Sequence, residues 1–308
     1  MSVLVVGSMA YDDIETPFEK RQNTLGGSAT YFSAAASFFT PVNLVAVVGD
    51  DFNHQDISFL KDKKIDLSGL TTEPGLTFRW GGRYLEDMIE RETLYTKLGV
   101  FENFNPVLPV HFKDSEYIFL ANIQPDLQYN VMQQVQQPKF VAMDTMNFWI
   151  TGTLPDLKKT LGLVDCLVIN DSEVRLLSQK NNIFQGAKII QDMGPKTLII
   201  KKGEHGSILI HGDSYFSCPA MPVENLFDPT GAGDTFAGGF MGYLAFAGEI
   251  TPATLRRAIV MGTVMASFCV QDFGTDKIKS ITDKDISQSV SRLLDIIMIE
   301  EDNLWIKR

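Results

Sequence analysis

Short apolar runs rich in valine and isoleucine recur along the chain. Each run is apolar at successive positions rather than at alternate ones, which is typical of strands buried on both faces of a parallel sheet. Because most runs are followed by a segment with helical periodicity, the pattern predicts an α/β fold, a doubly wound and mainly parallel central sheet flanked by helices. The runs are SVLVVGS, VNLVAVVGD, EYIFLAN, KFVAMD, DCLVIN and KTLIIKKG, at residues 2–8, 42–50, 116–122, 139–144, 165–170 and 196–203.

The ends of these runs indicate where a ligand would bind. In open α/β sheets, ligands bind outside the carboxyl ends of the strands. Polar or glycine residues stand near those ends, so we expect the site at that edge of the sheet. These residues are Gly7, Gly49, Asn122, Asp144, Asn170 and Lys202.

Two regions depart from the alternation of strand and helix. Residues 76–98 contain the alternating segment ETLYTKL and a polar turn near Glu86 and Asp87, which predicts an antiparallel hairpin. With residues 11–24 we expect it to form a small β lid on a single domain spanning residues 1–308. Near the carboxyl end, Thr251 as N-cap and Pro252 at the first helical position predict a long helix.

Composition limits the classes of binding partner and the cellular compartment that we expect. The 308 residues carry a formal net charge of −11 at pH 7, which repels phosphate backbones, so we expect no nucleic-acid partner. No apolar stretch approaches the ~20 residues that span a bilayer, so we expect no membrane partner. Three scattered cysteines and an amino terminus unlike a secretory signal predict a cytoplasmic protein with reduced thiols.

The segment Gly-Ala-Gly-Asp at residues 231–234 comes directly before an apolar helical run. The first N–H groups of a helix lack internal partners and lie at the positive end of its dipole, so this turn is a candidate anion site. Asp234 beside such a site could accept the proton of an attacking hydroxyl, or it could only cap the helix.

Two other phosphate-binding motifs are excluded by pattern. No Gly-x-x-x-x-Gly-Lys-Ser/Thr sequence occurs, which excludes a P-loop. Gly231 and Gly233 lack the third glycine of the dinucleotide fingerprint, because Phe236 stands there, and no buried strand precedes them. A dehydrogenase is therefore disfavoured.

The stretch DPTGAGDTFAGGF resembles the carboxyl-terminal signature of the ribokinase, or PfkB, family of sugar and nucleoside kinases. Six of seven signature positions agree, and Pro229 departs from the commoner threonine. The resemblance implies a ribokinase-like fold and transfer of phosphate from ATP with Mg²⁺. It also implies that Asp234 is the general base and that Gly231, Ala232 and Gly233 form the anion hole.

A second stretch, LGGSATYFSAAASFF at residues 25–39, resembles the amino-terminal signature of the same family. This resemblance implies that Gly26 and Gly27 approach the acceptor substrate. Tyr31 stands where many members carry Asn, and it could stack on a ring or fill the core. By the same resemblance Asp12 would bind two acceptor hydroxyls, with Asp13 as the alternative.

Two further segments resemble motifs that lie beside the nucleotide in members of this family. Asn170 and Glu173 resemble its Asn-x-x-Glu motif, which implies that they hold Mg²⁺ through water. The alternative is a helix cap, with Asn170 as N-cap and Glu173 at N3. The remaining residues expected beside the nucleotide are Lys202, Gly203, Gly206 and Asp228. Gly203 and Gly206 could instead serve only a turn, and Asp228 could only cap its turn.

These expectations combine into an ATP- and Mg²⁺-dependent kinase that phosphorylates a hydroxyl of a sugar or nucleoside. The hairpin with Arg79, Trp80 and Arg83 would close over the acceptor and exclude water. It could instead pair with a second copy and give a homodimer. The alternative function is a catalytically silent sugar or nucleoside sensor with a kinase-like fold, although a sensor needs neither Asp234 nor the Asn170/Glu173 pair.

Overall fold

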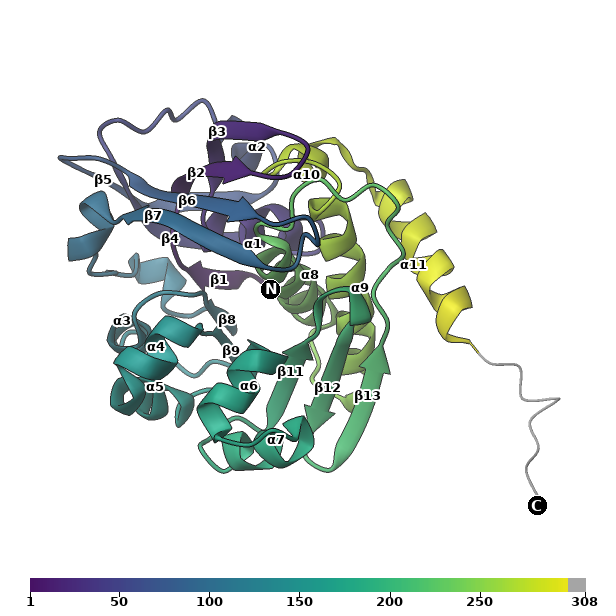
Figure 1. Ribbon diagram of the computed structural model, residues 1–308. Helices are drawn as coiled ribbons and strands as arrows, with labels where there is room; N and C mark the ends of the chain where they lie inside the picture. Colours follow the sequence, from purple (N-terminus) through teal and green to yellow (C-terminus); the bar gives the residue numbers. More distant parts are fainter. Residues whose placement is uncertain (299–308) are drawn as a thin grey trace, which may run out of the picture.

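A nine-stranded sheet forms the centre of the computed structural model, which describes residues 1–298 (Figure 1). The strand order is β13-β12-β11-β10-β9-β8-β1-β4-β5, and all neighbours are parallel except the antiparallel pairs of β12 with β11 and β13. The strands are β1 Val3–Val6, β4 Val42–Gly49, β5 Ile65–Glu73, β8 Tyr117–Leu120, β9 Phe140–Asp144, β10 Cys166–Asn170, β11 Thr197–Lys201, β12 Ser207–His211 and β13 Ser214–Cys218. The predicted mainly parallel sheet is confirmed.

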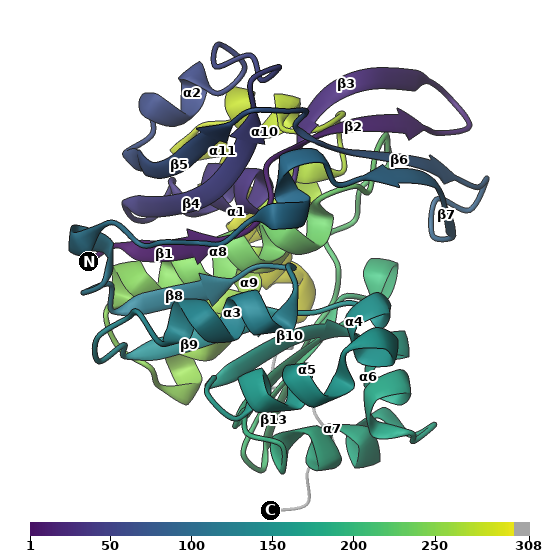
Figure 2. The same ribbon diagram turned by 90° about the vertical axis from the view of Figure 1, so that its left-hand side faces the viewer.

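Helices cover both faces of this sheet, as Figures 1 and 2 show. One face carries α1 Ser28–Ala36, α2 Ser58–Lys61, α8 Ala232–Ala247, α9 Pro252–Cys269, α10 Asp276–Ser280 and α11 Asp283–Ile297. The other carries α3 Pro125–Met132, α4 Asn147–Gly152, α5 Leu154–Leu161, α6 Asp171–Ser178 and α7 Ile183–Gln191. Short 3₁₀ turns lie at η1 Gly99–Asn103, η2 Val110–Phe112 and η3 Gly203–His205.

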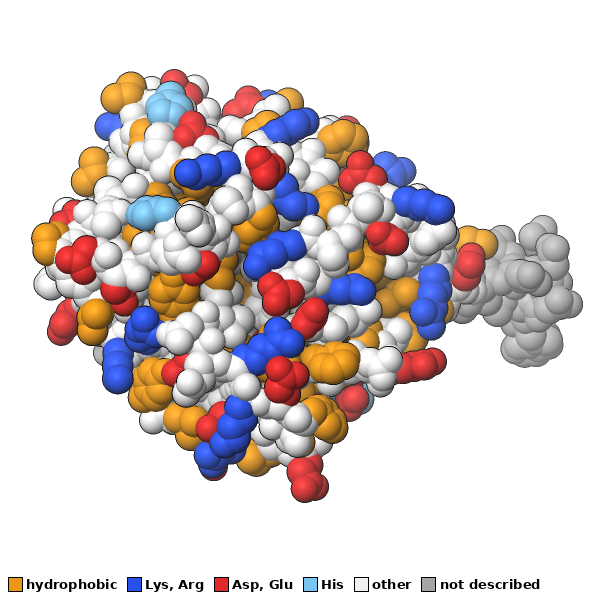
Figure 3. Space-filling view, turned by 90° about the horizontal axis from the view of Figure 1, so that it is seen from above, with side chains coloured by type: hydrophobic (Ala, Val, Ile, Leu, Met, Phe, Trp, Pro, Cys, Tyr) orange, Lys and Arg blue, Asp and Glu red, His pale blue; other side chains and the backbone are white. Residues whose placement is uncertain are grey.

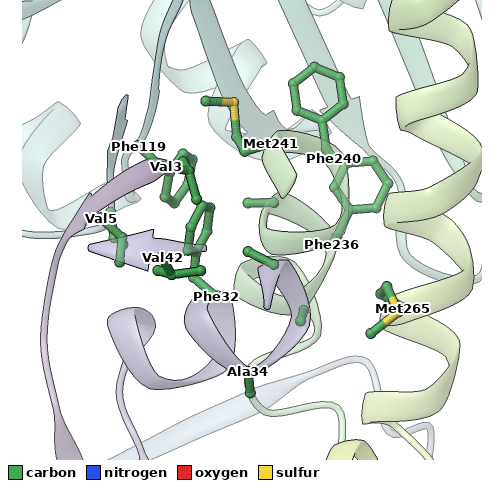
Figure 4. Packing of buried hydrophobic residues seen from close by; sticks show 14 of the residues in the cluster. Val3, Val5, Phe32, Ala34, Val42, Phe119, Phe236, Phe240, Met241 and Met265 are labelled. Carbon is green, nitrogen blue, oxygen red and sulfur yellow. The ribbon is translucent and has the colours of Figure 1, made fainter. Parts of the chain in front are cut away.

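Successive strand residues feed two separate hydrophobic cores, as expected for strands buried on both faces. In β1, Val3 and Val5 contribute to the core under α1 and α8, whereas Leu4 and Val6 contribute to the opposite core. Figure 4 shows the first core, where Phe32 of α1 stacks on Phe119 of β8 with ring centroids 4.6 Å apart. This stacking fixes α1 on the sheet.

Glycines allow α8 to lie unusually close to α1. A side chain on Gly238 would contact the carbonyl oxygen of Phe32, and one on Gly242 would lie 2.9 Å from Cα of Ala36. The glycines of α8 therefore serve close helix packing, which offsets their low helix propensity. As a result, the starts of α1 and α8 are held together.

A second, four-stranded sheet projects from the body of the molecule (Figure 2). Its order is β3-β2-β6-β7, in which β2 pairs with β6 in parallel while β2–β3 and β6–β7 are antiparallel hairpins. The strands are β2 Ala10–Glu15, β3 Lys20–Gly26, β6 Phe78–Tyr84 and β7 Arg91–Lys97. The hairpin predicted at residues 76–98 and the small β sheet are thus confirmed.

A small apolar cluster joins this sheet to the main body. Ile14 and Tyr84 of the small sheet pack with Phe273, which follows α9, and Trp80 and Met88 border the cluster. The turn between β6 and β7 is closed by Asp87, whose carboxylate accepts the backbone N–H groups of residues 89 and 90. The roles of the small sheet as a lid and as a dimer contact stay predictions.

Charges of both signs are intermixed on the face seen from above in Figure 3, without an extended patch of one sign. Within residues 1–298, no helix is both long and apolar enough to span a bilayer.

Candidate active site

The Gly-Ala-Gly-Asp segment forms the first turn of α8, as predicted. Gly231 is the N-cap with φ 76°, a left-handed conformation that favours glycine. A side chain there would also lie 2.5 Å from the ring of Tyr31, because that ring packs flat against the turn. Tyr31 is only 1% exposed, so its ring packs between this turn and the protein interior.

The backbone of this turn leaves amide donors unused. The N–H of Ala232 donates to the carbonyl oxygen of Pro229 at 3.2 Å. In the part of the chain that the structure describes, the N–H groups of Gly231 and Gly233 donate no hydrogen bond. Since no side chain caps this helix, its positive end faces outward as a site for an anion.

Asp234 lies half-buried in the same turn. Burial and, to a smaller extent, the neighbouring Asp144 carboxylate raise its pKa to about 7, against the opposing effect of Lys201 and Arg91. A carboxylate with a pKa near neutrality can exchange a proton at physiological pH. The arrangement is therefore suited to taking a proton from a hydroxyl group placed beside the anion site.

Asp12 and Asp13 differ sharply in their surroundings. Both carboxylate oxygens of Asp13 are engaged within the small sheet, by the backbone N–H of Asn23 and the hydroxyl of Tyr95. Asp12 is 4% exposed, and no hydrogen bond to its carboxylate is found among residues 1–298. Its carboxylate lies directly against the bare Cα of Gly26, and burial followed by the charges of nearby carboxylates raises its pKa well above the usual range.

The turn at Gly26 and Gly27 brings the start of α1 close to β1. Gly27 is the N-cap of α1 with φ 92°, and a side chain there would lie 2.5 Å from the carbonyl oxygen of Ser8. Only glycine fits this close approach. Asp12, Gly26 and the first turn of α1 therefore lie together.

Asp228 holds the loop that leads into α8. Its side chain has no exposed surface. One carboxylate oxygen accepts the N–H of Thr230 at 2.8 Å, and the other accepts the N–H of Gly274 at 3.4 Å. This geometry matches the turn-capping alternative, and contact of Asp228 with a nucleotide stays a prediction.

Asn170 and Glu173 form a capping box at the start of α6. The Asn170 side chain accepts the N–H of Glu173 at 2.8 Å, and the Glu173 carboxylate accepts the N–H of Asn170 at 2.9 Å. Within residues 1–298, no three His, Cys, Asp or Glu side chains gather as a metal-ligand set. The second oxygen of Glu173 makes no hydrogen bond to another residue of this part, so the pair suits a cation held through water.

Lys201 lies in the candidate site, and the sequence analysis did not predict it. It is the last residue of β11, and its Nζ lies 3.6 Å from a carboxylate oxygen of Asp144, the last residue of β9. Lys201 and Lys202 are adjacent, and the apolar run alone does not determine which of them ends the strand. The η3 turn follows, flanked by Lys202 and Gly206, and contact of Lys202, Gly203 and Gly206 with a nucleotide stays a prediction.

The tip of the β6–β7 hairpin also reaches this region. The hydroxyl of Tyr84 hydrogen-bonds the hydroxyl of Thr230 at 3.1 Å, directly before the Gly-Ala-Gly-Asp turn. Arg91 faces Tyr84 across the hairpin, and its charge acts on both Asp12 and Asp234. Arg79 and Arg83, which the sequence singled out, instead pair with Asp51 and with Glu15.

A cavity of about 450 Å³ lies elsewhere, between β4, β5 and η1. Its lining includes Val45, Val47, Thr71, Phe104 and a single acidic side chain, Glu73. It has no convergent set of charged groups like that around α8, so the carboxylate-rich region is the better candidate site.

Comparison with known proteins gives a consistent result. A family model described as pfkB family carbohydrate kinase matches residues 2–282. The cytidine kinase of Thermococcus kodakarensis is 27% identical over 281 residues, which is 89% of this chain and 98% of that protein.

Solved structures share the fold at lower identity. The nucleoside kinase of Burkholderia thailandensis in complex with inosine is 19% identical with a TM-score of 0.79, covering 95% of this chain and 98% of that one. The fructokinase of Vibrio cholerae O395 with fructose, ADP and calcium is 18% identical with a TM-score of 0.75, covering 94% and 98%.

Proposed function

The chain belongs to the pfkB family of carbohydrate kinases, and from that premise we propose that it phosphorylates a nucleoside or sugar hydroxyl with Asp234 as general base. One observation carries the assignment of the base. Asp234 has a pKa of about 7 and lies in the same helical turn as unused backbone N–H donors. A group that accepts a proton and a group that binds an anion are thus placed together.

The chemistry follows from this placement. The acceptor oxygen attacks the γ-phosphorus of ATP, a new O–P bond forms, and the bond from phosphorus to the β–γ bridging oxygen breaks. ADP leaves with the electrons of that bond, and the hydroxyl proton passes to Asp234. The N–H groups of Gly231 and Gly233 stabilise the negative charge on the transferring oxygens.

Asp12 is the residue we assign to the acceptor. Its carboxylate has free acceptor capacity, whereas both oxygens of Asp13 are already used within the small sheet. A carboxylate can accept hydrogen bonds from two neighbouring hydroxyls, as a ribose or another sugar presents. A nucleoside is the first acceptor class to test, because the relative from T. kodakarensis is a cytidine kinase.

The residues fit a Mg²⁺ ion that is held mainly by water and by nucleotide phosphates. Asn170 and Glu173 already bond each other in the capping box, so they would hold the ion through water rather than as direct ligands. When bound, the ion neutralises charge on the phosphate oxygens.

The test is Mg²⁺-dependent release of ADP from ATP across a panel of nucleosides and sugars. We expect one acceptor to be turned over, and Asp234→Asn to lower kcat by about 10²- to 10⁴-fold with little change in nucleotide affinity. A rate for Asp234→Asn equal to that of the wild type, with an active acceptor, would exclude Asp234 as the base.

Asp12 and Asp13 provide a matched pair in the same assay. Asp12→Asn should raise KM for the acceptor more than tenfold, because an amide donor replaces one of the two buried acceptor oxygens. Asp13→Asn should leave KM near the wild-type value. The reverse pattern would assign the acceptor to Asp13.

A further inference from the structure

Lys201 points away from its own strand and toward the first turn of α8. It is paired in register with Asn170, the last residue of β10, and its side chain passes the end of β10 to approach Asp144 of β9. A side chain on Gly233 would lie 3.0 Å from Lys201 Nζ. The ammonium group therefore lies beside the unused N–H of Gly233.

The ammonium group of Lys201 is poorly satisfied where it stands. An ammonium group offers three donors, and charge-assisted hydrogen bonds to a carboxylate are about 2.7–2.9 Å long. Its ion pair with a carboxylate oxygen of Asp144 is 3.6 Å long, and Nζ donates no hydrogen bond to another side chain or carbonyl within residues 1–298. Because only 21% of the side chain is exposed, water replaces the missing partners only in part.

Three nearby carboxyl groups favour the charged form of Lys201. Asp144, Glu173 and Asp234 all act on Lys201, and together they raise its pKa although burial works in the opposite direction. Lys201 is thus a fixed positive charge among three carboxyl groups. A polyphosphate could not approach so acidic a region unless positive charge met it there.

We propose that Lys201 binds the terminal phosphoryl group of the bound nucleoside triphosphate, while Asp144 holds its ammonium group beside Gly233. This inference rests on the proposed function. The terminal phosphoryl group would supply the acceptor oxygens that Lys201 lacks. Since a diphosphate has no group at this position, Lys201 makes the site prefer ATP over ADP and favours release of the product.

The experiment measures equilibrium binding of ADP and of a non-hydrolysable ATP analogue, which needs no acceptor. Lys201→Met should weaken binding of the ATP analogue by about tenfold and change binding of ADP by less than twofold. Lys201→Arg, which keeps the charge, should restore most of the preference. Lys196→Met, at the exposed opposite end of β11, is the matched control and should behave as wild type.

Turnover provides the second measurement. With an active acceptor, Lys201→Met should lower kcat by about 10²-fold or more, as expected when one group that stabilises transition-state charge is removed. Lys201→Gln is measured as well, with a melting curve for each variant, so that a loss of folding is not taken for a loss of binding.

Three results would overturn the inference. Lys201→Met could weaken ADP and the ATP analogue equally, it could leave both affinities and kcat unchanged, or Lys202→Met could cause the selective loss instead. Failure of the proposed function is a different result, because the wild-type protein would then turn over no acceptor whether or not Lys201 affects nucleotide binding.

Discussion

With Asp234 as the proposed base, its titration would link activity to pH. Its pKa is raised from 3.8 to about 7, so the deprotonated form that can accept a proton becomes the major form only above pH 7. We expect kcat/KM for the acceptor to rise with pH through about 7 and then level off, because this ratio reports ionisations of the free enzyme. A pH–rate profile measures this rise. A profile that is flat between pH 5 and 8 would contradict the assignment.

The same raised pKa affects the stability of the folded protein. Between pH 3.8 and 7 the folded state retains a proton on Asp234 that the unfolded state has lost, so this group destabilises the fold progressively as pH rises through that window. Asp234→Asn should therefore be more stable than wild type at pH 8, by about 1–3 kcal/mol after allowance for partial exposure.

Thermal unfolding at two pH values measures this effect. The stabilisation by Asp234→Asn should shrink toward pH 4, where the carboxyl group is protonated in both states. Asp213→Asn, at an exposed position between β12 and β13, is the control for the loss of one negative charge. The variant expected to lose activity is thus also the one expected to gain stability.

The β6–β7 hairpin is the element that connects the small sheet to the reacting groups. Tyr84 ends β6 and hydrogen-bonds Thr230, so the position of the hairpin is tied to the turn that starts α8. Tyr84→Phe removes this bond and leaves the ring in its apolar cluster. Loss of one such bond costs about 1 kcal/mol, which is about fivefold in the population of the docked hairpin.

We expect this loss to appear as uncoupled ATP hydrolysis. The ratio of ADP formed to acceptor phosphorylated should rise several-fold in Tyr84→Phe, because a less firmly docked hairpin admits water. Tyr95→Phe, which removes a hydroxyl contact to Asp13 within the same sheet, should leave the ratio unchanged. Equal ratios in both variants would show that the contact with Thr230 does not control access of water.

At the scale of the whole molecule, continuous apolar runs were the most reliable signal. The six predicted strands appear as β1, β4, β8, β9, β10 and β11, because burial on both faces leaves an unbroken apolar sequence. The strands missed were β5, β12 and β13, which lie toward the two edges of the sheet. β5, with the sequence IDLSGLTTE, and β13, with SYFSC, are partly polar, so their pairing depends on neighbours that the local sequence does not reveal.

In the candidate site too, some residues could be predicted from local sequence and others come together only through tertiary contacts. Gly231 and Asp234 belong to one turn, so a short motif was enough to predict that they lie together at the start of a helix. Lys201 meets Asp144 only because β9, β10 and β11 lie side by side, and Arg91 approaches Asp12 only because the hairpin docks. Asn170 and Glu173 form the capping box that was the alternative for their motif, and binding of Mg²⁺ through water by the same pair stays a prediction.

The two carboxylates assigned to the acceptor belong to different bodies of the protein. Asp12 is part of the small sheet, whereas Asp234 is part of α8, which the glycine contacts hold against α1. The acceptor must reach both carboxylates at once. The enzyme would then select acceptors by one distance. This is the distance between the hydroxyls that Asp12 holds and the hydroxyl that is phosphorylated. A molecule that is too short could bind to Asp12 without being phosphorylated, and would act as a competitive inhibitor.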